Sequence, residues 1–455
     1  MTFMLYSVTS SKMKFFIRTF GCQMNVHDST RIAHLLAQHG YARSETPENA
    51  DVILINTCSV REKAWHKAVS EAGRFGALKK KHPNAILVLA GCVAEQEEDR
   101  FFKPVPSIDI VIGPDHYAEL PRLLENAVSG KQHQVVTGFD KGRPEDFLAS
   151  YPGHRANAAS QFLTIMKGCS QKCTYCIVPS VRGPERDRDV DSILSDAAKL
   201  VSAGAKEIVL LGQKVNGYKK NGVTFSKLLS YLCDIEGLER LRFTSPHPMH
   251  MTDELVRAFA DLKPLCEGIH LPVQAGSDDV LARMKRRYTR ADYLDVAKRL
   301  KATVPGFQIY TDLIVGFPGE RAEDFEETLS LYEEVRFAGA FSFKYSPRPG
   351  TKAAMEMPDD VTAEEKTRRL DALHTVIERI EREIKAEMVG RHQEILIEGA
   401  ARLPGQMTGR TRNNQIVNVA MPKKGILKQW IGKTVAVEIT NAMPHSLEGV
   451  VRERV

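Results

Sequence analysis

The chain has 455 residues, more than one typical domain holds, and 43% of them are hydrophobic, which is enough to form cores. No hydrophobic run is as long as a membrane span, and residues 1–13 lack the regions of a signal peptide, so we expect a cytoplasmic protein without membrane contact. Eight cysteines in such a chain favour metal chemistry over disulfides, and the net charge of +6 is compatible with nucleic-acid binding without strongly indicating it.

Three strand-like hydrophobic runs near the N-terminus each end in a cysteine, and helical segments separate them. This alternation predicts a parallel sheet with right-handed crossovers, in which the carboxyl ends of the strands lie along one edge. One cysteine at a strand end is usually a small buried hydrophobic residue, whereas three at the same topological position predict a metal site. The runs cover residues 14–22, 51–58 and 85–92, the helices cover residues 27–40 and 63–80, and the cysteines are Cys22, Cys58 and Cys92.

Three further cysteines lie within eight residues, in the pattern C-x3-C-x2-C formed by Cys169, Cys173 and Cys176. Three thiolates can bind three irons of a [4Fe–4S] cube and leave the fourth iron open for a group that is not protein. A structural zinc site or an ordinary thiol cluster is the alternative. Structural zinc needs a fourth Cys or His nearby, and none follows within the next several residues, so we favour an iron–sulfur cluster.

Six strand–helix units follow in the middle of the chain and predict a partial (β/α)6 barrel, two units short of the closed eightfold form. Catalytic groups of such barrels lie at the C-terminal ends of the strands, and the C-x3-C-x2-C segment follows the first strand as this rule requires. Polar residues follow other strands, although each of them taken singly is more often a hydrogen-bonding residue at a loop end. The expected strands cover residues 162–166, 207–211, 240–244, 268–272, 308–315 and 340–345.

The C-terminal part of the chain has a different pattern. Residues 130–159, before the barrel, show little periodicity and are interpreted as a linker, whereas a long charged helix is expected over residues 363–388. From Val389 short strands with glycines between them predict a small β-barrel. Arg410 and Arg412 give this barrel a basic rim, and small barrels of this type often bind RNA. A capping or dimerisation module is the alternative on composition alone.

Together, these features resemble the methylthiotransferase family of radical S-adenosylmethionine (SAM) enzymes, from about Met13 to the C-terminus. Three strings around the N-terminal cysteines are similar to those of the family members that modify N6-isopentenyladenosine in tRNA. Members that modify a ribosomal protein have GCPKN at the first cysteine, and members that modify threonylcarbamoyladenosine have GCKVN. The strings that carry the resemblance are GCQMN (residues 21–25), NTCSVREKA (56–64), GCVAEQE (91–97), LLGQKVN (210–216), SPHP (245–248), LPVQAGS (271–277) and TDLIVGFPGE (311–320).

The resemblance implies an α/β protein of three domains and two kinds of cofactor. The domains are an N-terminal methylthiotransferase domain with a parallel sheet (residues 13–135), a partial radical SAM barrel (155–388) and a small RNA-binding β-barrel, the TRAM domain (389–455). The cofactors are SAM and two [4Fe–4S] clusters, one on each cysteine triad. No catalytic residue is expected beyond the cluster ligands. The residues expected to contact SAM are Gln213, Asn216, Ser245, Asp312 and Gly316, and those expected to contact RNA are Arg410 and Arg412.

The implied reaction adds a methylthio group to C2 of N6-isopentenyladenosine at position 37 of tRNA, 3′ to the anticodon. We expect a monomer that binds tRNA and receives electrons from a flavodoxin-type reductant. Two other substrates stay open at this point, threonylcarbamoyladenosine in tRNA and a ribosomal-protein side chain. The alternative outside enzymes is a non-catalytic iron–sulfur protein that binds RNA.

Overall fold

The computed structural model describes residues 13–59, 62–139, 159–422 and 426–452. Most of the expected linker over residues 130–159, including the expected domain start at residue 155, lies outside them. The chain divides into two compact units. Unit 1 is Met1–Ala149 with Ser180–Gly183, and unit 2 is Ser150–Pro179 with Pro184–Val455. Among the described residues no helix combines the length and hydrophobicity needed to cross a bilayer.

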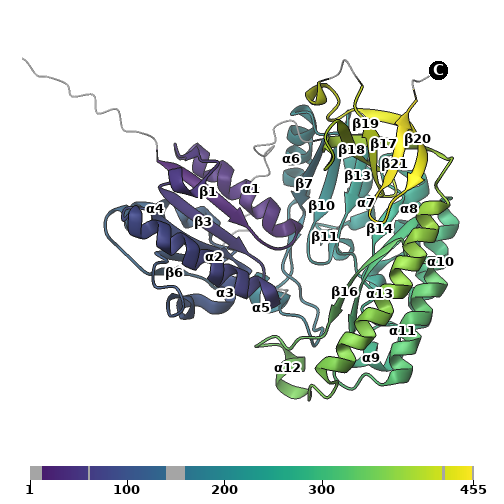
Figure 1. Ribbon diagram of the computed structural model, residues 1–455, viewed down its shortest axis with the longest axis horizontal. Coiled ribbons are helices and arrows are strands. Elements are labelled where there is room, and N and C mark those ends of the chain that lie inside the picture. The colour runs from purple at the N-terminus through teal and green to yellow at the C-terminus, as the bar shows by residue number, and fades with distance from the viewer. Residues whose placement is uncertain (1–12, 60–61, 140–158, 423–425, 453–455) are drawn as a thin grey trace, which may run out of the picture. The chain divides into compact units, whose positions relative to one another are not determined.

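Unit 1 is built on a six-stranded parallel sheet in the order β2-β1-β3-β4-β5-β6 (Figure 1). Helices α1 and α4 contribute to the core on one face, and α2 and α3 to the core on the other. Every residue of β3 and β4 is buried, as expected for parallel strands covered on both faces. The strands are β1 (Lys14–Thr19), β2 (Ala42–Arg43), β3 (Val52–Thr57), β4 (Ile86–Gly91), β5 (Ile110–Ile112) and β6 (Gln134–Val136), and the helices are α1 (Gln23–Gln38), α2 (Glu62–Lys81), α3 (Cys92–Glu97) and α4 (Leu120–Val128).

Unit 2 contains the six expected parallel barrel strands, in two three-stranded groups ordered β13-β10-β7 and β14-β15-β16. The two groups meet through a single bridge between Leu241 and Leu265. Hydrophobic residues on the outer side of the strands pack against the helices and form the largest core of the chain's described part. The strands are β7 (Ser160–Thr164), β10 (Glu207–Leu211), β13 (Arg240–Phe243), β14 (Gly268–His270), β15 (Gln308–Val315) and β16 (Gly339–Lys344), and the larger helices are α6 (Val190–Ser202), α7 (Phe225–Cys233), α8 (Asp253–Asp261), α10 (Arg290–Thr303), α11 (Ala322–Val335) and α13 (Ala363–Ala386).

Short elements complete unit 2 around the strand ends. The two-stranded pairs β8–β9 and β11–β12 are antiparallel. These elements are β8 (Met166–Lys167), β9 (Arg186–Asp187), β11 (Lys219–Lys220), β12 (Val223–Thr224), α9 (Asp278–Arg283) and α12 (Lys352–Glu356), with α5 (Val178–Arg182) crossing from unit 2 to unit 1.

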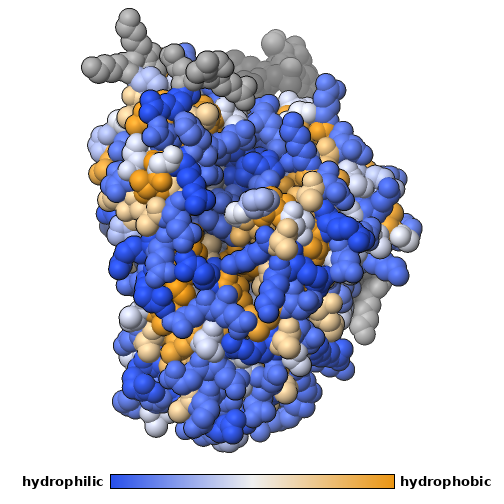
Figure 2. All heavy atoms as spheres, turned by 90° about the vertical axis from the view of Figure 1, so that its right-hand side faces the viewer, coloured by the Kyte–Doolittle hydropathy of each residue, from blue (hydrophilic) through white to orange (hydrophobic). Residues whose placement is uncertain are grey.

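The long charged helix α13 begins after Thr362, whose hydroxyl accepts a hydrogen bond from the Glu365 amide and caps the helix. Its charged side chains form ion pairs at the surface, for example Arg379 with Glu333. The face of the molecule in Figure 2 is mainly hydrophilic, with hydrophobic side chains in small areas between the charged ones. Such ion pairs form a solvated face, as expected, but three cations of the helix, Lys366, Arg369 and Lys385, are buried.

The C-terminal strands close into a five-stranded barrel in the order β17-β18-β19-β21-β20. Alternate residues point inward and form a small core of their own. The fold class expected from the sequence is confirmed: a parallel-sheet α/β domain, a partial barrel and a small β-barrel. The strands are β17 (His392–Ala400), β18 (Gln406–Thr411), β19 (Ile416–Ala420), β20 (Thr434–Ala442) and β21 (Leu447–Val451).

Candidate functional site

The three N-terminal cysteines follow three neighbouring strands of the unit 1 sheet. Cys22 follows β1, Cys58 follows β3 and Cys92 follows β4, and these strands lie side by side in the order β1-β3-β4. The register pairs Thr19 with Asn56 and Thr57 with Gly91, so the three strands end at nearly the same level. Parallel pairing thus brings these residues to one edge of the sheet, as the sequence pattern predicts.

Two glycines allow the cysteine loops to approach the end of β3. Gly21 has φ +129°, and a Cβ atom there would lie 2.3 Å from the Cys58 Cβ atom. Gly91 has φ +94°, and a Cβ atom there would lie 2.4 Å from the Thr57 carbonyl oxygen. Both glycines are therefore required by the backbone conformation and by the lack of space.

Hydrogen bonds hold the Cys22 loop against β3. The Cys22 thiol donates to Asn25 Oδ1 at 3.2 Å, and Asn25 Nδ2 donates to Asn56 Oδ1 at 3.1 Å. Cys22 is exposed, whereas Cys58 and Cys92 are buried. A hydrogen bond with the Cys58 thiol and the nearby Arg182 charge lower the pKa of Cys22 to about 6. Cys22 is therefore readily deprotonated, and the thiolate is the form that binds metals.

Arg182 lies beside the third cysteine of this set and was not indicated by any sequence pattern. Its Nε donates to Cys92 Sγ at 3.2 Å, and its Nη1 donates to Asp28 Oδ2 at 2.7 Å. Burial raises the pKa of Cys92, and the Arg182 guanidinium opposes that rise. Arg182 belongs to the short segment Ser180–Gly183, which joins unit 1 although it is more than 150 residues away from Asp28 in the sequence.

The second set, Cys169, Cys173 and Cys176, lies in the loop between β8 and α5 of unit 2, and its members are half-buried. The loop is fastened to the barrel through Thr174. The Thr174 amide donates to the Met284 carbonyl at 3.2 Å, and the Ala353 amide donates to the Thr174 carbonyl at 2.8 Å. Burial raises the pKa of Cys176 to about 12 and also raises that of Cys169. These thiols therefore need a metal to lose their protons at neutral pH.

Each set supplies three thiols, the number that a [4Fe–4S] cube with one open iron would bind. Across the described ranges no three His, Cys, Asp or Glu side chains lie close enough together to hold one metal ion. In a [4Fe–4S] cube each thiolate binds a different iron, so the ligands lie farther apart than around one ion. Three cysteines also leave one iron without a protein ligand, which is the position that SAM needs.

The five expected SAM contacts differ in what they do in the fold. Gln213 follows β10, and its Oε1 is buried without a hydrogen-bond partner, which leaves an acceptor for a ligand. Asn216 has its amide fully engaged, because Nδ2 donates to the His247 carbonyl at 2.9 Å and Oδ1 accepts from the His247 amide at 2.8 Å. Ser245 follows β13 with φ +58°, a strained backbone conformation for a residue other than glycine.

Asp312 and Gly316 lie on and after β15. Asp312 is within the strand rather than at its end, and its Oδ1 is 2.9 Å from Nε2 of His270. Gly316 follows the strand with φ +68°, and its amide donates to the buried Glu320 carboxylate. A Cβ atom there would lie 2.3 Å from Lys366 Cγ, so the packing of α13 already requires glycine.

Two cationic residues near the second cysteine set were given no role from the sequence, although the LLGQKVN string contains Lys214. Arg286 Nη1 donates to Cys173 Sγ at 3.5 Å, and Lys214 Nζ pairs with Glu185 at 2.9 Å. Burial, together with these two positive charges and His250, lowers the pKa of His247 to about 2, so its imidazole is neutral. The SPHP string pointed to His247, whereas nothing in the sequence pointed to Arg286.

The two arginines expected to contact RNA already have partners within unit 2. Arg412 Nε donates to the Glu267 carboxylate at 2.9 Å, and Nη2 donates to the Leu265 carbonyl at 3.0 Å, which fastens the small barrel to the base of the large one. Arg410 bonds within the small barrel, to Glu398 and Asn414 at 3.3 Å, and its side chain remains 35% exposed.

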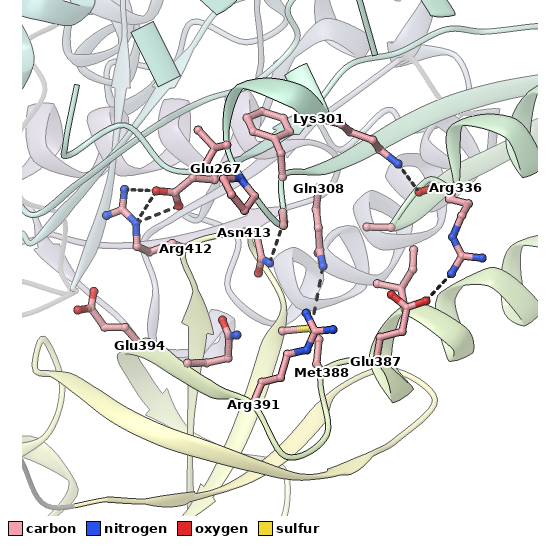
Figure 3. A pocket seen from close by; sticks show the side chains of 17 residues that line it. Glu267, Lys301, Gln308, Arg336, Glu387, Met388, Arg391, Glu394, Arg412 and Asn413 are labelled. Atoms are coloured by element: carbon pink, nitrogen blue, oxygen red, sulfur yellow. Dashed lines mark hydrogen bonds and ion pairs between the residues drawn. The ribbon is translucent and has the colours of Figure 1, made fainter. Parts of the chain in front are cut away.

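A cavity of about 500 Å³ lies at this junction (Figure 3). Its walls come from Glu267 before β14, from Gln308 at the start of β15, and from Arg412 and Asn413 of the small barrel. These positions are at the N-terminal ends of the barrel strands, whereas the cysteine loop and Gln213 follow C-terminal ends. The cavity is therefore separate from the cysteine site.

Comparisons with known proteins agree with this geometry. The chain matches the family models of the Uncharacterized protein family UPF0004 over residues 14–113, the Radical SAM superfamily over residues 163–332 and the TRAM domain over residues 386–451. Among solved structures, the radical S-adenosylmethionine methyltransferase TsrM from Kitasatospora setae is similar with a TM-score of 0.56 at 12% identity, covering 76% of this chain and 78% of that one. This likeness confirms the fold. The radical SAM match implies SAM and a [4Fe–4S] cluster.

Curated relatives are similar over nearly the whole chain. The tRNA-2-methylthio-N(6)-dimethylallyladenosine synthase of Bordetella petrii is 44% identical over 98% of this chain and 92% of its own length. The proteins of that name from Haemophilus influenzae and Geobacter sulfurreducens are 43% and 44% identical, over 96% and 95% of this chain and 92% and 96% of their own lengths. The resemblance found in the sequence is thus confirmed, and the chain belongs to the tRNA-2-methylthio-N(6)-dimethylallyladenosine synthase family.

Proposed function

We propose that this chain is a radical SAM methylthiotransferase that adds a methylthio group to C2 of N6-isopentenyladenosine at position 37 of tRNA, 3′ to the anticodon. The observation that carries the proposal is the convergence of Cys22, Cys58 and Cys92 at the ends of three neighbouring strands. A chain that only cleaved SAM would need the C-x3-C-x2-C segment alone. A second set of three thiols, one fewer than the four ligands of a [4Fe–4S] cube, suits a reaction that also transfers sulfur.

Each cysteine set holds one [4Fe–4S] cluster in this proposal. When bound, the cluster on Cys169, Cys173 and Cys176 supplies the electron that cleaves SAM. The chain's own contribution is to fix the loop, through the backbone bonds of Thr174 to Met284 and Ala353. The protein positions and shields the reactants, while the cofactors carry the chemistry.

SAM is oriented by the residues at the C-terminal ends of the barrel strands. Gln213 offers its unpaired Oε1 as an acceptor for an amino or hydroxyl group of SAM. Ser245, Asp312 and Gly316 are proposed as further contacts. Asn216 acts by holding the loop of His247, because both ends of its amide are used there.

Transfer RNA binds with help from the small barrel. We propose three domains: a methylthiotransferase domain (13–135), the radical SAM barrel (155–388) and the small barrel (389–455). The boundary between the second and third domains is supported by the change from α13 to β17 between Ala386 and His392. Arg410 and Arg412 are the proposed RNA contacts. Arg410 is the better placed of the two, because Arg412 is engaged by Glu267. The electron comes from a flavodoxin-type reductant, and the chain acts as a cytoplasmic monomer.

Nucleoside mass spectrometry tests the proposal. In tRNA from cells lacking this chain, isopentenyladenosine should persist without its methylthio group, and the wild-type chain should restore the modification. Chains with alanine at all three cysteines of either set should not restore it. The matched control replaces Cys233 and Cys266, which belong to neither set. Methylthiolation by the chain without Cys22, Cys58 and Cys92 would contradict the proposal.

Iron content separates the two sets in purified protein. After anaerobic reconstitution each triple variant should contain about half of the wild-type iron, since each set holds one four-iron cluster. SAM cleavage should be lost without Cys169, Cys173 and Cys176 but should persist without the N-terminal set. Full iron in the variant lacking the N-terminal set would show that no cluster binds there.

A further inference from the structure

Arg182 is a buried cation beside Cys92 whose hydrogen bonding is incomplete. Its side chain is 4% exposed, and it donates through Nε to the Cys92 sulfur and through Nη1 to Asp28. The remaining nitrogen, Nη2, is buried and has no hydrogen-bond partner among the described residues. A buried guanidinium is costly to desolvate, and a donor of a charged group left without an acceptor adds to that cost.

A second buried donor without an acceptor lies in the same region. Tyr117 is 3% exposed, and its hydroxyl has no partner within the described part of the chain. Burial raises the pKa of Tyr117, and the charges of Asp28, Arg182 and Cys92 act on it, which places the hydroxyl in their neighbourhood. Two buried donors without acceptors, one of them on a side chain that bonds to Cys92, indicate that an acceptor outside the protein completes this site.

The chemistry of the site identifies that acceptor. Arg182 already bonds to the thiol of Cys92, one of the three cysteines assigned above to the second cluster. The inorganic sulfides and thiolate sulfurs of an iron–sulfur cluster accept hydrogen bonds, and such bonds help to set the reduction potential. A simple structural role for Arg182, as the partner of Asp28, would account for Nη1 but not for Nε or Nη2.

We propose that Arg182 is a positioning residue of the N-terminal cluster, which donates to its sulfur atoms, while Asp28 orients the guanidinium and Tyr117 supplies a further donor. This inference rests on the proposed second cluster. Donation from a cation stabilises the more negatively charged, reduced state of a cluster. Removal of Arg182 therefore shifts the reduction potential to more negative values. Partners that orient ligands in this way commonly affect metal affinity as well.

The test uses the full-length chain in which Cys169, Cys173 and Cys176 are alanine, so that only the N-terminal cluster remains. Arg182→Gln, Arg182→Lys and Tyr117→Phe are added singly, and each protein is reconstituted without oxygen. The reduction potential and the electron paramagnetic resonance spectrum of the reduced cluster are measured, with iron content and thermal unfolding alongside. Arg74→Gln is the matched control, because it removes an exposed guanidinium that pairs with Glu71 in the same unit.

Arg182→Gln should shift the potential to more negative values, and Tyr117→Phe should shift it less in the same direction. Arg182→Lys keeps the charge, so its reduction potential should lie between those of Arg182→Gln and the parent. An unchanged potential and spectrum in both Arg182→Lys and Tyr117→Phe would overturn the inference, even if Arg182→Gln failed to fold. Absence of iron from the parent chain would instead overturn the second cluster itself.

Discussion

Single glycines decide whether the N-terminal cysteines can meet. Gly91 precedes Cys92, has φ +94°, and faces the Thr57 carbonyl so closely that a Cβ atom would lie 2.4 Å from it. The backbone there must stay fixed, because Thr57 and Gly91 are paired in the sheet. A side chain at this position therefore moves the Cys92 loop away from Cys58.

Gly91→Ala should destabilise unit 1 and reduce iron binding by the N-terminal set. Strain of this kind costs on the order of 1–3 kcal/mol, to which the steric clash adds. Thermal unfolding and iron content after reconstitution measure the two effects. Gly40→Ala is the control, because Gly40 has a similar φ of +85° but open space around it. Equal thermal unfolding and iron content in the two variants would show that the clash with the Thr57 carbonyl is unimportant.

A buried carboxylate makes the stability of unit 1 depend on pH. Burial raises the pKa of Glu95 to about 7, although the Gly138 amide donates to its Oε1 at 2.8 Å and opposes the rise. The folded state then binds a proton that the unfolded state releases near pH 4.5. This stabilisation is complete below about pH 4.5 and is lost as the pH rises through about 7.

Glu95→Gln should therefore flatten the dependence of unfolding on pH between 5 and 7.5, because glutamine stays neutral throughout. Thermal unfolding at several pH values within that interval measures the slope. Glu97→Gln, on the same helix, controls for the loss of a carboxylate as such. If Glu95→Gln keeps the wild-type slope, Glu95 is already ionised in the folded protein at pH 5.

At the scale of elements, two arginines of β13 bind the end of β18 and the start of the turn that follows it. Arg242 donates to Glu207 at 2.7 Å and to the main-chain carbonyls of Thr411 and Arg412 at 2.8 and 2.7 Å. Arg240 donates to the Arg410 carbonyl at 2.6 Å. Arginine side chains thus take the place of strand pairing between the large barrel and the small one.

Arg242→Met should loosen the small barrel, because it leaves the Glu207 carboxylate buried without its main cationic partner. Breaking a buried pair in this way costs about 3–5 kcal/mol. Differential scanning calorimetry should show a lower first transition, and limited proteolysis should cut earlier between α13 and β17. Arg452→Gln is the control, because it breaks an exposed pair with Glu438, which is worth at most about 1 kcal/mol. Identical thermograms for the two variants would contradict this role.

The helices and strands could be predicted where the hydrophobic residues follow one clear pattern, but their ends could be predicted less well. The runs that became β3 and β4 are continuously hydrophobic, which indicates buried parallel strands. The first barrel strand was expected at residues 162–166 but runs over Ser160–Thr164, because the chain then pairs as β8 with β9. Helix α1 begins at Gln23 rather than near residue 27, because Cys22 is its N-cap residue.

The candidate sites could also be predicted only in part. Cysteine spacing and strand order together predict where the thiols meet, because parallel strands share an edge. Arg182 could not be predicted, since its contacts with Asp28 and Cys92 join segments 154 and 90 residues apart. The pairing of Arg412 is a second example. A basic residue in a turn suggests a phosphate contact, but only the folded chain shows that Glu267 already pairs with it.

At the scale of the whole molecule, we expect substrate choice to depend on an apolar surface for the prenyl group. On β16, Ser342 and Lys344 bond to α13 through His374 and Thr367, so the alternate residues Phe341 and Phe343 face the interior of the barrel. Phe341 is 59% exposed, so its ring is accessible to a ligand. We expect it to offer apolar surface to the prenyl group, which presents only methyl and methylene carbons.

Transfer RNA bearing isopentenyladenosine should therefore be methylthiolated, unmodified tRNA only weakly, and threonylcarbamoylated tRNA not at all. Burial of a prenyl group stabilises binding by roughly 25 cal/mol per Å² of apolar area, whereas a threonylcarbamoyl carboxylate would need a cationic partner. Phe341→Ala should narrow the difference between isopentenylated and unmodified tRNA, measured as the ratio of kcat/KM values by nucleoside mass spectrometry. Met355→Ala is the control, because Met355 is also exposed but lies on α12. Equal rates on isopentenylated and threonylcarbamoylated tRNA would contradict an apolar pocket and favour the threonylcarbamoyladenosine enzymes instead.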